Sequence, residues 1–261
     1  MKTKEVIDYL DLTFRPELQE DYDNSGFLLG DENSIYRGSL VALDLTVEVI
    51  EEAIREGVNL IVTHHPLIFS GIKRITNRNA TGRMVQELIK HDIAVYAAHT
   101  NLDNLAWGVN GALADKLGLL NRSILHPIDS DYTTGAGMVG TLVQEESICD
   151  FLERVKKILD IPFLRTSPCS PQKKVLRVAL CGGSGAFLIE DALHAGADIY
   201  ITADLKYHDF QRTNPQMVLC DAGHYESEQF AKDIIFNTIS GKFSNFACRI
   251  SAVQKSLIRY I

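Results

Sequence analysis

The sequence predicts an α/β protein made of two similar lobes with mostly parallel sheets. Three observations support this fold class: short, nearly continuous apolar segments alternate with helical patterns, one strand–helix–strand unit recurs, and polar side chains follow the apolar segments. With 261 residues, the chain is long enough for two such lobes, each with its own core.

The first strand–helix–strand unit lies near the amino terminus. Residues 39–44 form an apolar strand, residues 46–56 carry apolar side chains at helical spacing, and residues 58–62 form a second apolar strand. Thr46 is the expected N-cap of the helix, and Gly57 is the expected residue just past its end. Further along, the same patterns predict helices over residues 82–91 and 147–159 and strands over residues 93–98 and 137–143.

A second unit resembles the first. The matching residues are Val41-Ala42-Leu43 with Val178-Ala179-Leu180, Ala53 with Ala192, Gly57 with Gly196, and Thr63 with Thr202. Aligned in this way, the second unit carries two extra residues in its first turn, between Cys181 and Gly185. The alternative is an accidental match, because all strand–helix–strand units look alike; we favour a true repeat.

The repeat predicts two Rossmann-like lobes with a ligand cleft at the carboxyl ends of their strands. Residues 1–105 together with residues 221–261 are expected to form the first lobe, and residues 106–220 the second. The metal site described below is expected in the cleft between them.

The composition excludes several classes of protein. Lys and Arg number 26 against 34 Asp and Glu, a formal net charge of −8, so nonspecific nucleic-acid binding is not expected. No apolar stretch approaches the roughly 18 residues of a membrane-spanning helix, and we expect no membrane partner. The five cysteines include no Cys-x-x-Cys motif, so we expect a reducing, cytoplasmic location.

Two adjacent histidines, His64 and His65, end the second strand of the first unit. Successive side chains of a strand point to opposite faces, so the two imidazoles can serve two metal ions, or one ion if the backbone turns. The alternative is that they are only polar residues at a strand exit. The strand over residues 93–98 exits toward Asp103, which reaches the same edge of a parallel sheet and offers a carboxylate ligand.

A third cluster follows the apolar segment 217–220. If a helix begins near His224, Glu228 lies one turn later on the same face, whereas Glu226 does not. Acidic residues favour a first helical turn, which accounts for both glutamates but not for the histidine beside them. His224 and Glu228 are therefore an expected ligand pair, and Glu226 is expected only to favour the helix start.

The candidate ligands combine three imidazoles and two carboxylates. They exceed what one tetrahedral zinc ion uses and suit two ions about 3.5–4 Å apart with a bridging carboxylate. The set fits zinc, iron, manganese or cobalt and does not choose among them. The ligands are His64, His65, Asp103, His224 and Glu228.

Motifs along nearly the whole chain carry a family resemblance. The segments are Asp23–Gly30, Thr63–Phe69, Ala98–Asp103, Thr202–His208 and Gly223–Glu228. They resemble the Nif-three-like family, whose bacterial members are labelled GTP cyclohydrolase 1 type 2 homologs. The resemblance implies one ion held by His64, Asp103 and Glu228 and another held by His65, His224 and Glu228. It also implies a toroidal homohexamer with the metals facing its interior. The inserted middle domain of longer members is expected to be absent.

The leading functional hypothesis is a metal-dependent hydrolase of a small molecule. Two divalent cations would activate a bridging water and polarise a purine C8, phosphoryl or amide centre. The rival hypothesis is a non-enzymatic metal-binding or regulatory scaffold protein. A proton donor or a substrate anchor beside the metals would favour the enzyme.

Several residues are secondary candidates for such roles. His99 and His208 are candidates for acid–base catalysis, with a structural role as the alternative. Lys206 can meet a phosphate, although a solvated lysine is the simpler interpretation. Gly182–Gly185 lies between a strand and a helix, where phosphate can bind, but it matches neither nucleotide-binding motif, so a tight turn is favoured.

Overall fold

The structure is a computed structural model that describes residues 1–212 and 216–259. The chain divides into two compact units. Unit 1 comprises Met1–Leu102 and Ala231–Lys255, and unit 2 comprises Asp103–Phe230 together with the segment that begins at Ser256. Asp103, His224 and Glu228 therefore belong to unit 2, whereas His64 and His65 belong to unit 1.

Unit 1 contains one five-stranded sheet and its helices. The helices are α1 (Thr3–Phe14), η1 (Pro16–Leu18), α2 (Val47–Glu56), α3 (Ala80–Lys90), the short α4 (Thr100–Asp103) that ends at the unit boundary, and α9 (Ala231–Lys242). The strands are β1 (Gly26–Leu29), β2 (Ser39–Ala42), β3 (Leu60–Thr63), β4 (Ala94–Ala97) and β11 (Cys248–Ile250).

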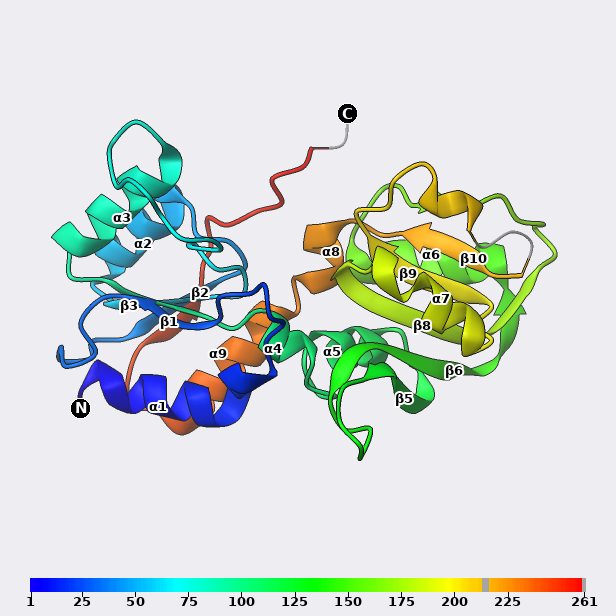
Figure 1. Cartoon of the computed structure of the whole chain (residues 1–261), viewed down its shortest axis with the longest axis horizontal. Coiled ribbons are helices and arrows are strands. Elements are labelled where there is room, and N and C mark those ends of the chain that lie inside the picture. The colour runs from blue at the N-terminus through cyan, green and yellow to red at the C-terminus, as the bar shows by residue number, and fades with distance from the viewer. Residues whose placement is uncertain (213–215, 260–261) are drawn as a thin grey trace. The chain divides into compact units, whose positions relative to one another are not determined.

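The strand order in unit 1 is β1-β4-β3-β2-β11, and every pairing except that of β1 with β4 is parallel. Helices α2 and α3 cover one face of this sheet, and α1 and α9 lie side by side over the other (Figure 1). Apolar side chains of β2, β3, β4, α2 and α3 form one buried cluster. Because β2, β3 and β4 are parallel, their carboxyl ends meet at one edge, where His64 and His65 follow β3.

Unit 2 contains a six-stranded sheet. Its strands are β5 (Leu120–Pro127), β6 (Gly135–Ser147), β7 (Arg165–Thr166), β8 (Lys174–Ser184), β9 (Ile199–Ala203) and β10 (Val218–Asp221). Its helices are α5 (Val109–Lys116), α6 (Ile148–Leu159), η2 (Ala186–Leu188), α7 (Ile189–His194), η3 (Asp209–Gln211) and α8 (His224–Glu228).

The strand order in unit 2 is β5-β6-β8-β9-β10-β7. Strands β8, β9 and β10 are mutually parallel, and β5, β6 and β7 pair antiparallel at the flanks. Side chains of α5 and α6 pack on one face of the sheet, and those of η2 and α7 pack on the other (Figure 1). The predicted α/β class with two lobes is thus confirmed. The sheet of unit 1 is mostly parallel, as predicted, whereas in unit 2 only the three central strands β8, β9 and β10 are parallel.

The two units share one order of elements, as the repeat predicted. Strands β2, β3 and β4 correspond to β8, β9 and β10, and β1 and β7 each pair antiparallel with the last of these strands. The left-handed Gly57 after α2 corresponds to the left-handed Gly196 after α7.

The predicted alignment of the first strands is wrong by two residues. Because Thr63 matches Thr202, the preceding residue Val62 corresponds to Ile201. Val41 pairs with Val62, and Leu180 pairs with Ile201. Val41 therefore corresponds to Leu180 rather than to Val178, and the first turn of the second unit contains no extra residues. A strand has a period of two, so a shift by two residues preserves its apolar pattern and hides the error.

The predicted boundaries of helix α2 are confirmed. The Thr46 side chain accepts a hydrogen bond from the backbone N–H of Val49 at 3.4 Å, and Gly57 ends the helix at φ +70°. At such a φ a glycine avoids the steric penalty of a Cβ. Both ends of α2 are thus set locally, which fixes where β3 begins and where its histidines emerge.

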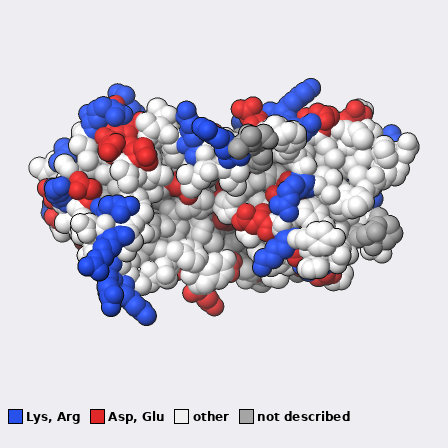
Figure 2. Space-filling view, turned by 90° about the horizontal axis from the view of Figure 1, so that it is seen from above, with Lys and Arg blue, Asp and Glu red and all other residues white. Residues whose placement is uncertain are grey.

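Within the described ranges 1–212 and 216–259, none of the helices has the length and apolarity needed to cross a membrane. Figure 2 shows one face of the protein, on which Lys and Arg side chains are interspersed with Asp and Glu.

Candidate metal centre

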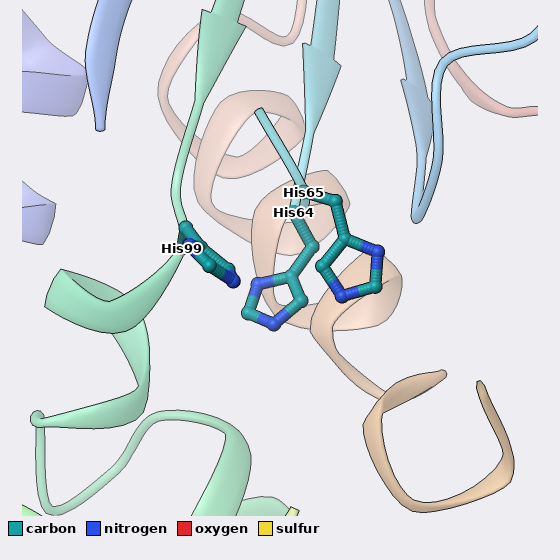
Figure 3. A group of neighbouring side chains, drawn as sticks. All are labelled: His64, His65 and His99. Atoms are coloured by element: carbon teal, nitrogen blue, oxygen red, sulfur yellow. The ribbon is translucent and has the colours of Figure 1, made fainter. Parts of the chain in front are cut away.

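Three histidines of unit 1 gather at the carboxyl edge of its sheet. His64 and His65 follow β3, and His99 follows the neighbouring strand β4 (Figure 3). Their ring centroids are 5.0 Å apart for His64 and His65, 5.3 Å for His64 and His99, and 5.5 Å for His65 and His99. One ring nitrogen of each lies within 4.8 Å of the others, a spacing at which the three could hold a metal ion.

The first two rings are oriented by oxygen acceptors. Nδ1 of His64 lies 2.7 Å from the carbonyl oxygen of Ala98, and Nδ1 of His65 lies 2.7 Å from Oδ1 of Asp44. A carbonyl or an ionised carboxylate can only accept a hydrogen bond, so Nδ1 carries the proton and the lone pair of the neutral ring is on Nε2. Metal-binding histidines are typically fixed in this way.

The third ring is held by a buried carboxylate. Nδ1 of His99 lies 2.7 Å from Oδ1 of Asp23, whose side chain is fully buried. The other Asp23 oxygen accepts hydrogen bonds from the backbone and hydroxyl of Thr100 and from the hydroxyl of Ser25. Burial alone would raise the pKa of Asp23, but hydrogen bonds from His99 and Thr100 hold that pKa well below its ordinary value. Asp23 is therefore an ionised acceptor.

The carboxyl-terminal segment contacts Asp44, the residue that orients His65. Nε2 of Gln254 lies 3.3 Å from Oδ2 of Asp44, and Oε1 of Gln254 accepts the backbone N–H of Leu43 at 2.8 Å. The parallel pairing of β11 with β2 brings this segment to the same edge of the sheet. Gln254 thus orients Asp44, and Asp44 orients His65.

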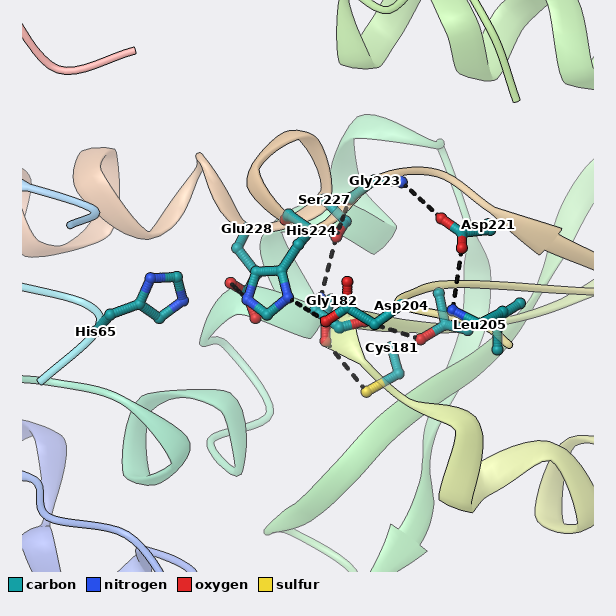
Figure 4. Close-up of polar contacts among 12 residues, drawn as sticks. His65, Cys181, Gly182, Asp204, Leu205, Asp221, Gly223, His224, Ser227 and Glu228 are labelled. Atoms are coloured by element: carbon teal, nitrogen blue, oxygen red, sulfur yellow. Dashed lines mark hydrogen bonds and ion pairs between the residues drawn. The ribbon is translucent and has the colours of Figure 1, made fainter. Parts of the chain in front are cut away.

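In unit 2, His224 and Glu228 lie on one face of helix α8, as the helical spacing predicts. Nε2 of His224 lies 2.9 Å from Oε2 of Glu228, and Nδ1 of His224 lies 2.8 Å from Oδ2 of Asp204 (Figure 4). Asp204 follows β9, the neighbour of the strand that leads into α8. This histidine therefore has a carboxylate at each ring nitrogen.

The backbone of strand β8 closes around Glu228. A Cβ on Gly183 would lie 2.0 Å from Oε1 of Glu228, and Gly183 has a φ of +61°. The Gly183 N–H donates to the hydroxyl of Ser227 at 3.0 Å, and that hydroxyl donates to the carbonyl of Gly223 at 2.8 Å. Residues 182–184 are therefore the end of a strand rather than the predicted tight turn, and they position a carboxylate.

Asp103 is tied to the same part of unit 2. Nδ2 of Asn110 donates to the carbonyl oxygen of Asp103 at 3.1 Å, and Oδ1 of Asn110 accepts the N–H of Gly182 at 2.9 Å. Burial raises the pKa of the Cys181 thiol, and the nearby charges of Asp103 and Glu228 raise it further. The two carboxylates thus act on one buried thiol, so they lie in the same neighbourhood.

Comparisons with known proteins decide the family. A family profile described as "Duf34/NIF3 (NGG1p interacting factor 3)" matches residues 1–256. The chain belongs to the Duf34/NIF3 family. It is 36% identical over 234 residues to a Clostridium acetobutylicum protein described as a "GTP cyclohydrolase 1 type 2 homolog", covering 87% of this chain and 85% of that protein. A Streptococcus pneumoniae protein of the same description is 34% identical over 238 residues, covering 90% of this chain and 89% of the relative.

Solved structures of Duf34/NIF3 proteins have the same fold. A Bacillus cereus protein described as related to NIF3 matches with a TM-score of 0.91 at 25% identity, covering 100% of this chain and 99% of the other. A hypothetical protein from Staphylococcus aureus matches with a TM-score of 0.91 at 31% identity and the same coverage.

Other residues singled out in this Duf34/NIF3 chain have different surroundings. His208 is exposed, and its Nδ1 lies 3.4 Å from Oε1 of Gln211. Lys206 is exposed too. Glu226, which was expected only to favour the helix start, is buried with 5% exposure. Its Oε2 atom has no hydrogen-bond partner among the residues that the structure describes.

The residues that orient the imidazoles of this Duf34/NIF3 protein were not among those predicted from the sequence. They are Asp23, Asp44, Asp204 and Gln254. Asp44 and Asp204 each follow a strand that neighbours a strand leading into a histidine. The rule that parallel strands meet at their carboxyl ends could have found them, whereas nothing local in the sequence marks Gln254.

Proposed function

We propose that this Duf34/NIF3 protein binds two divalent cations and is a metal-dependent hydrolase. The first ion would be held by His64, Asp103 and Glu228, and the second by His65, His224 and Glu228. Unit 1 would thus contribute two imidazoles, and unit 2 an imidazole and two carboxylates. The family resemblance suggests this grouping, and the donors within each unit support it.

The orientation of the histidines carries the proposal. Each of the three proposed imidazole ligands has Nδ1 within hydrogen-bond distance of an oxygen: the Ala98 carbonyl, Asp44 and Asp204. Partners of this kind fix the tautomer and the ring orientation of metal ligands. The mixture of imidazole and carboxylate suits zinc, iron, manganese or cobalt, so the residues fit the group that the family resemblance implies.

When bound, two such cations would supply Lewis acidity for activating water and polarising an electrophile. The chain itself would supply orientation and proton transfer. His99 and His208 are the candidates for the proton-transfer role, and His99 is the more constrained because Asp23 fixes its ring. The side chain of His208 is exposed to solvent, so a substrate could reach it.

The test combines metal analysis with a hydrolysis screen. The protein is purified without a metal-binding tag, and its bound metals are identified by elemental analysis. The metal-loaded protein is then tested on phosphoesters, amides and nucleotides, with GTP included because of the description of the relatives. We expect hydrolysis that a chelator abolishes and that Glu228→Ala removes.

A matched histidine control separates the site from the rest of the surface. His126 is exposed in unit 2, where its Nδ1 lies 3.4 Å from Oδ1 of Asp191. His126→Ala should keep both ions and the activity, whereas His65→Ala should lose the second ion and the activity. Chelator-insensitive activity would contradict the hydrolase proposal. Metal binding without turnover of any substrate class would instead favour the regulatory or metal-binding role.

A further inference from the structure

We propose that the segment between β3 and α3 forms a pocket that anchors the phosphate group of a small molecule. The pocket has a volume of about 800 Å³, within the range of about 300–1,000 Å³ that is typical of ligand pockets. It is lined by Leu67–Arg74, Asn79 and Thr81, all in unit 1, and includes no proposed metal ligand. The inference rests on the proposed hydrolase only in making the bound molecule its substrate, because the pocket itself needs no metal.

The charge of this segment is opposite to that of the whole chain. Residues 66–86 contain no Asp or Glu and four basic residues, Lys73, Arg74, Arg78 and Arg83, whereas the chain has a formal net charge of −8. Lys73 and Arg74 are exposed and line the pocket. A guanidinium presents a fork of N–H donors that matches phosphate oxygens, and the neighbouring ammonium adds a second positive charge. Two adjacent cations favour a doubly charged phosphate over a singly charged carboxylate.

Another part of the pocket is apolar and aromatic. The side chain of Phe69 is 49% exposed, and its ring centroid lies 6.2 Å from that of Tyr22, which is 62% exposed. The partly exposed Leu67, Ile68 and Ile72 line the same pocket. Exposed aromatic rings offer a stacking surface for a planar group. The ligand is therefore a phosphorylated molecule that also carries an aromatic or other apolar group.

Contacts at both ends of the segment fix its course beside α3 (Figure 1). Nδ2 of Asn24 donates a hydrogen bond to the carbonyl oxygen of Ile68 at 2.5 Å. A Cβ on Gly82, in the first turn of α3, would lie 2.1 Å from the carbonyl oxygen of Thr76, so the backbone of the segment packs directly on the helix. A pocket that is already formed loses less free energy in becoming ordered around its ligand.

The pocket adjoins the histidines of unit 1. The ring centroids of Phe69 and His99 are 6.1 Å apart, with an angle of 76° between the ring planes. His99 in turn lies beside His64 and His65. A molecule whose phosphate is held at the basic end of the pocket can therefore extend along Phe69 toward the proposed ions. The phosphate in this arrangement is an anchor and not the reacting group.

The experiment measures binding in the absence of metal. The full-length protein is stripped with a chelator and titrated with phenyl phosphate, inorganic phosphate and benzoate by isothermal titration calorimetry. We expect phenyl phosphate to bind most tightly, because it alone combines a phosphate with an apolar ring. The double variant Lys73→Gln, Arg74→Gln should bind it about 10-fold or more weakly, because each cation contributes a charge-assisted hydrogen bond. Phe69→Ala should reduce the advantage of phenyl phosphate over inorganic phosphate.

A second double variant controls for the change in net charge. Lys4→Gln, Arg249→Gln also removes two exposed cations of unit 1, neither of which lines the pocket. This variant should bind phenyl phosphate as tightly as the wild type does. If the protein hydrolyses a phosphorylated substrate, Lys73→Gln, Arg74→Gln should raise KM and leave kcat unchanged, because an anchor binds the ground state and the transition state equally.

Several outcomes would overturn the inference. If the metal-free wild-type protein binds no phenyl phosphate, or if the two double variants bind it equally well, the pocket is not a phosphate site. Benzoate binding more tightly than phenyl phosphate would show that phosphate is the wrong ligand class. None of these results contradicts the hydrolase, which chelator-sensitive turnover tests. Binding that depends on Lys73 and Arg74 without turnover of any substrate would support the pocket and contradict the hydrolase.

Discussion

At the scale of single residues, the protein uses hydrogen bonds to decide which nitrogen of each histidine faces a ligand. His64, His65, His99 and His224 each have Nδ1 within 2.8 Å of an oxygen acceptor. Rigid orientation matters because an imidazole that must first rotate or change tautomer loses part of its binding free energy. Glu228 is also held in place, because the backbone of β8 at Gly183 packs closely against its carboxylate.

The first prediction separates the two glutamates of α8. Glu228 is within 2.9 Å of His224, so Glu228→Ala should remove a ligand shared by both proposed ions and should lower the metal content to one ion or none. Glu226→Ala should keep the metal, since its carboxylate is no ligand in the proposed set. Elemental analysis of both folded variants checks this. Loss of metal in Glu226→Ala alone would reassign the ligand to Glu226.

The second prediction concerns Gly183. Its φ of +61°, and the 2.0 Å that would separate an added Cβ from Oε1 of Glu228, make Gly183→Ala costly in two ways. The left-handed conformation costs about 1–2 kcal/mol, and the forced movement of the carboxylate costs about 1–3 kcal/mol more. We expect a lower melting temperature and weaker metal binding.

Gly196 provides the matched control for Gly183. It has a φ of +68° but no heavy atom within 4 Å of an added Cβ. Gly196→Ala should therefore lose only the conformational part of the stability and should bind metal normally. Equal melting temperatures and equal metal affinities for the two variants would show that the approach to Glu228 does not matter.

At the scale of elements, parallel neighbours deliver residues from distant parts of the chain to one sheet edge. Strand β11 is a short edge strand, yet its pairing with β2 brings Gln254 to Asp44 and so to His65. In unit 2, β9 and β10 do the same for Asp204 and His224. The order of strands, rather than any local motif, therefore completes the environment of the histidines.

The third prediction tests the support that the segment after β11 gives to His65. Asp44→Ala should weaken metal binding by about 10–100-fold, and Gln254→Ala should weaken it less because it acts through Asp44. The exposed Lys255→Ala is the control. Metal titrations of the folded variants check the order. Wild-type affinity in Asp44→Ala would mean that the orientation of His65 does not depend on this hydrogen bond.

Much of the fold could be predicted from the sequence because local patterns determine it. Helix α2 was found from its apolar spacing, its Thr46 cap and Gly57, and the structure has all three features. The pair His224 and Glu228 was found from helical spacing alone. These predictions depended only on residues close together in the sequence, within the same helix or next to its ends.

The remainder depended on contacts between segments far apart in the chain. The alignment of Val41 with Val178 failed because an apolar strand looks the same after a shift of two residues. Asp23 binds His99 across 76 residues, so no local pattern marks it. Burial of Glu226 was likewise missed, because helical spacing identifies a shared face and leaves open what covers the other faces.

At the scale of the whole molecule, two units with one order of elements carry different donors. His65 follows β3 where Asp204 follows β9, so the repeat supplies an imidazole in unit 1 and a carboxylate in unit 2. Different residues at the ends of corresponding strands can therefore give two units of the same fold different metal-binding side chains. The units are equivalent in topology and complementary in chemistry.

The fourth prediction concerns assembly. The family resemblance implies a toroidal homohexamer, and closed rings are a frequent symmetry of soluble homo-oligomers. Light scattering should give six times the mass of one chain at micromolar concentration, with and without a chelator. A single-chain mass across that range would contradict the hexamer while leaving the metal proposals untouched.

The fifth prediction concerns the metal content and its effect on stability. Five ligands with a shared Glu228 imply two ions per chain, which saturating metal and elemental analysis should detect. Ions that bind only the folded state stabilise it, by about 2.7 kcal/mol at a metal concentration 100 times Kd. For a chain of this size that corresponds to roughly 5–10 °C in melting temperature. Adding a chelator should remove this stabilisation, and Glu228→Ala should show a much smaller shift. An unchanged melting temperature under saturating metal, or a content that never exceeds one ion, would contradict a dinuclear centre that binds the folded protein.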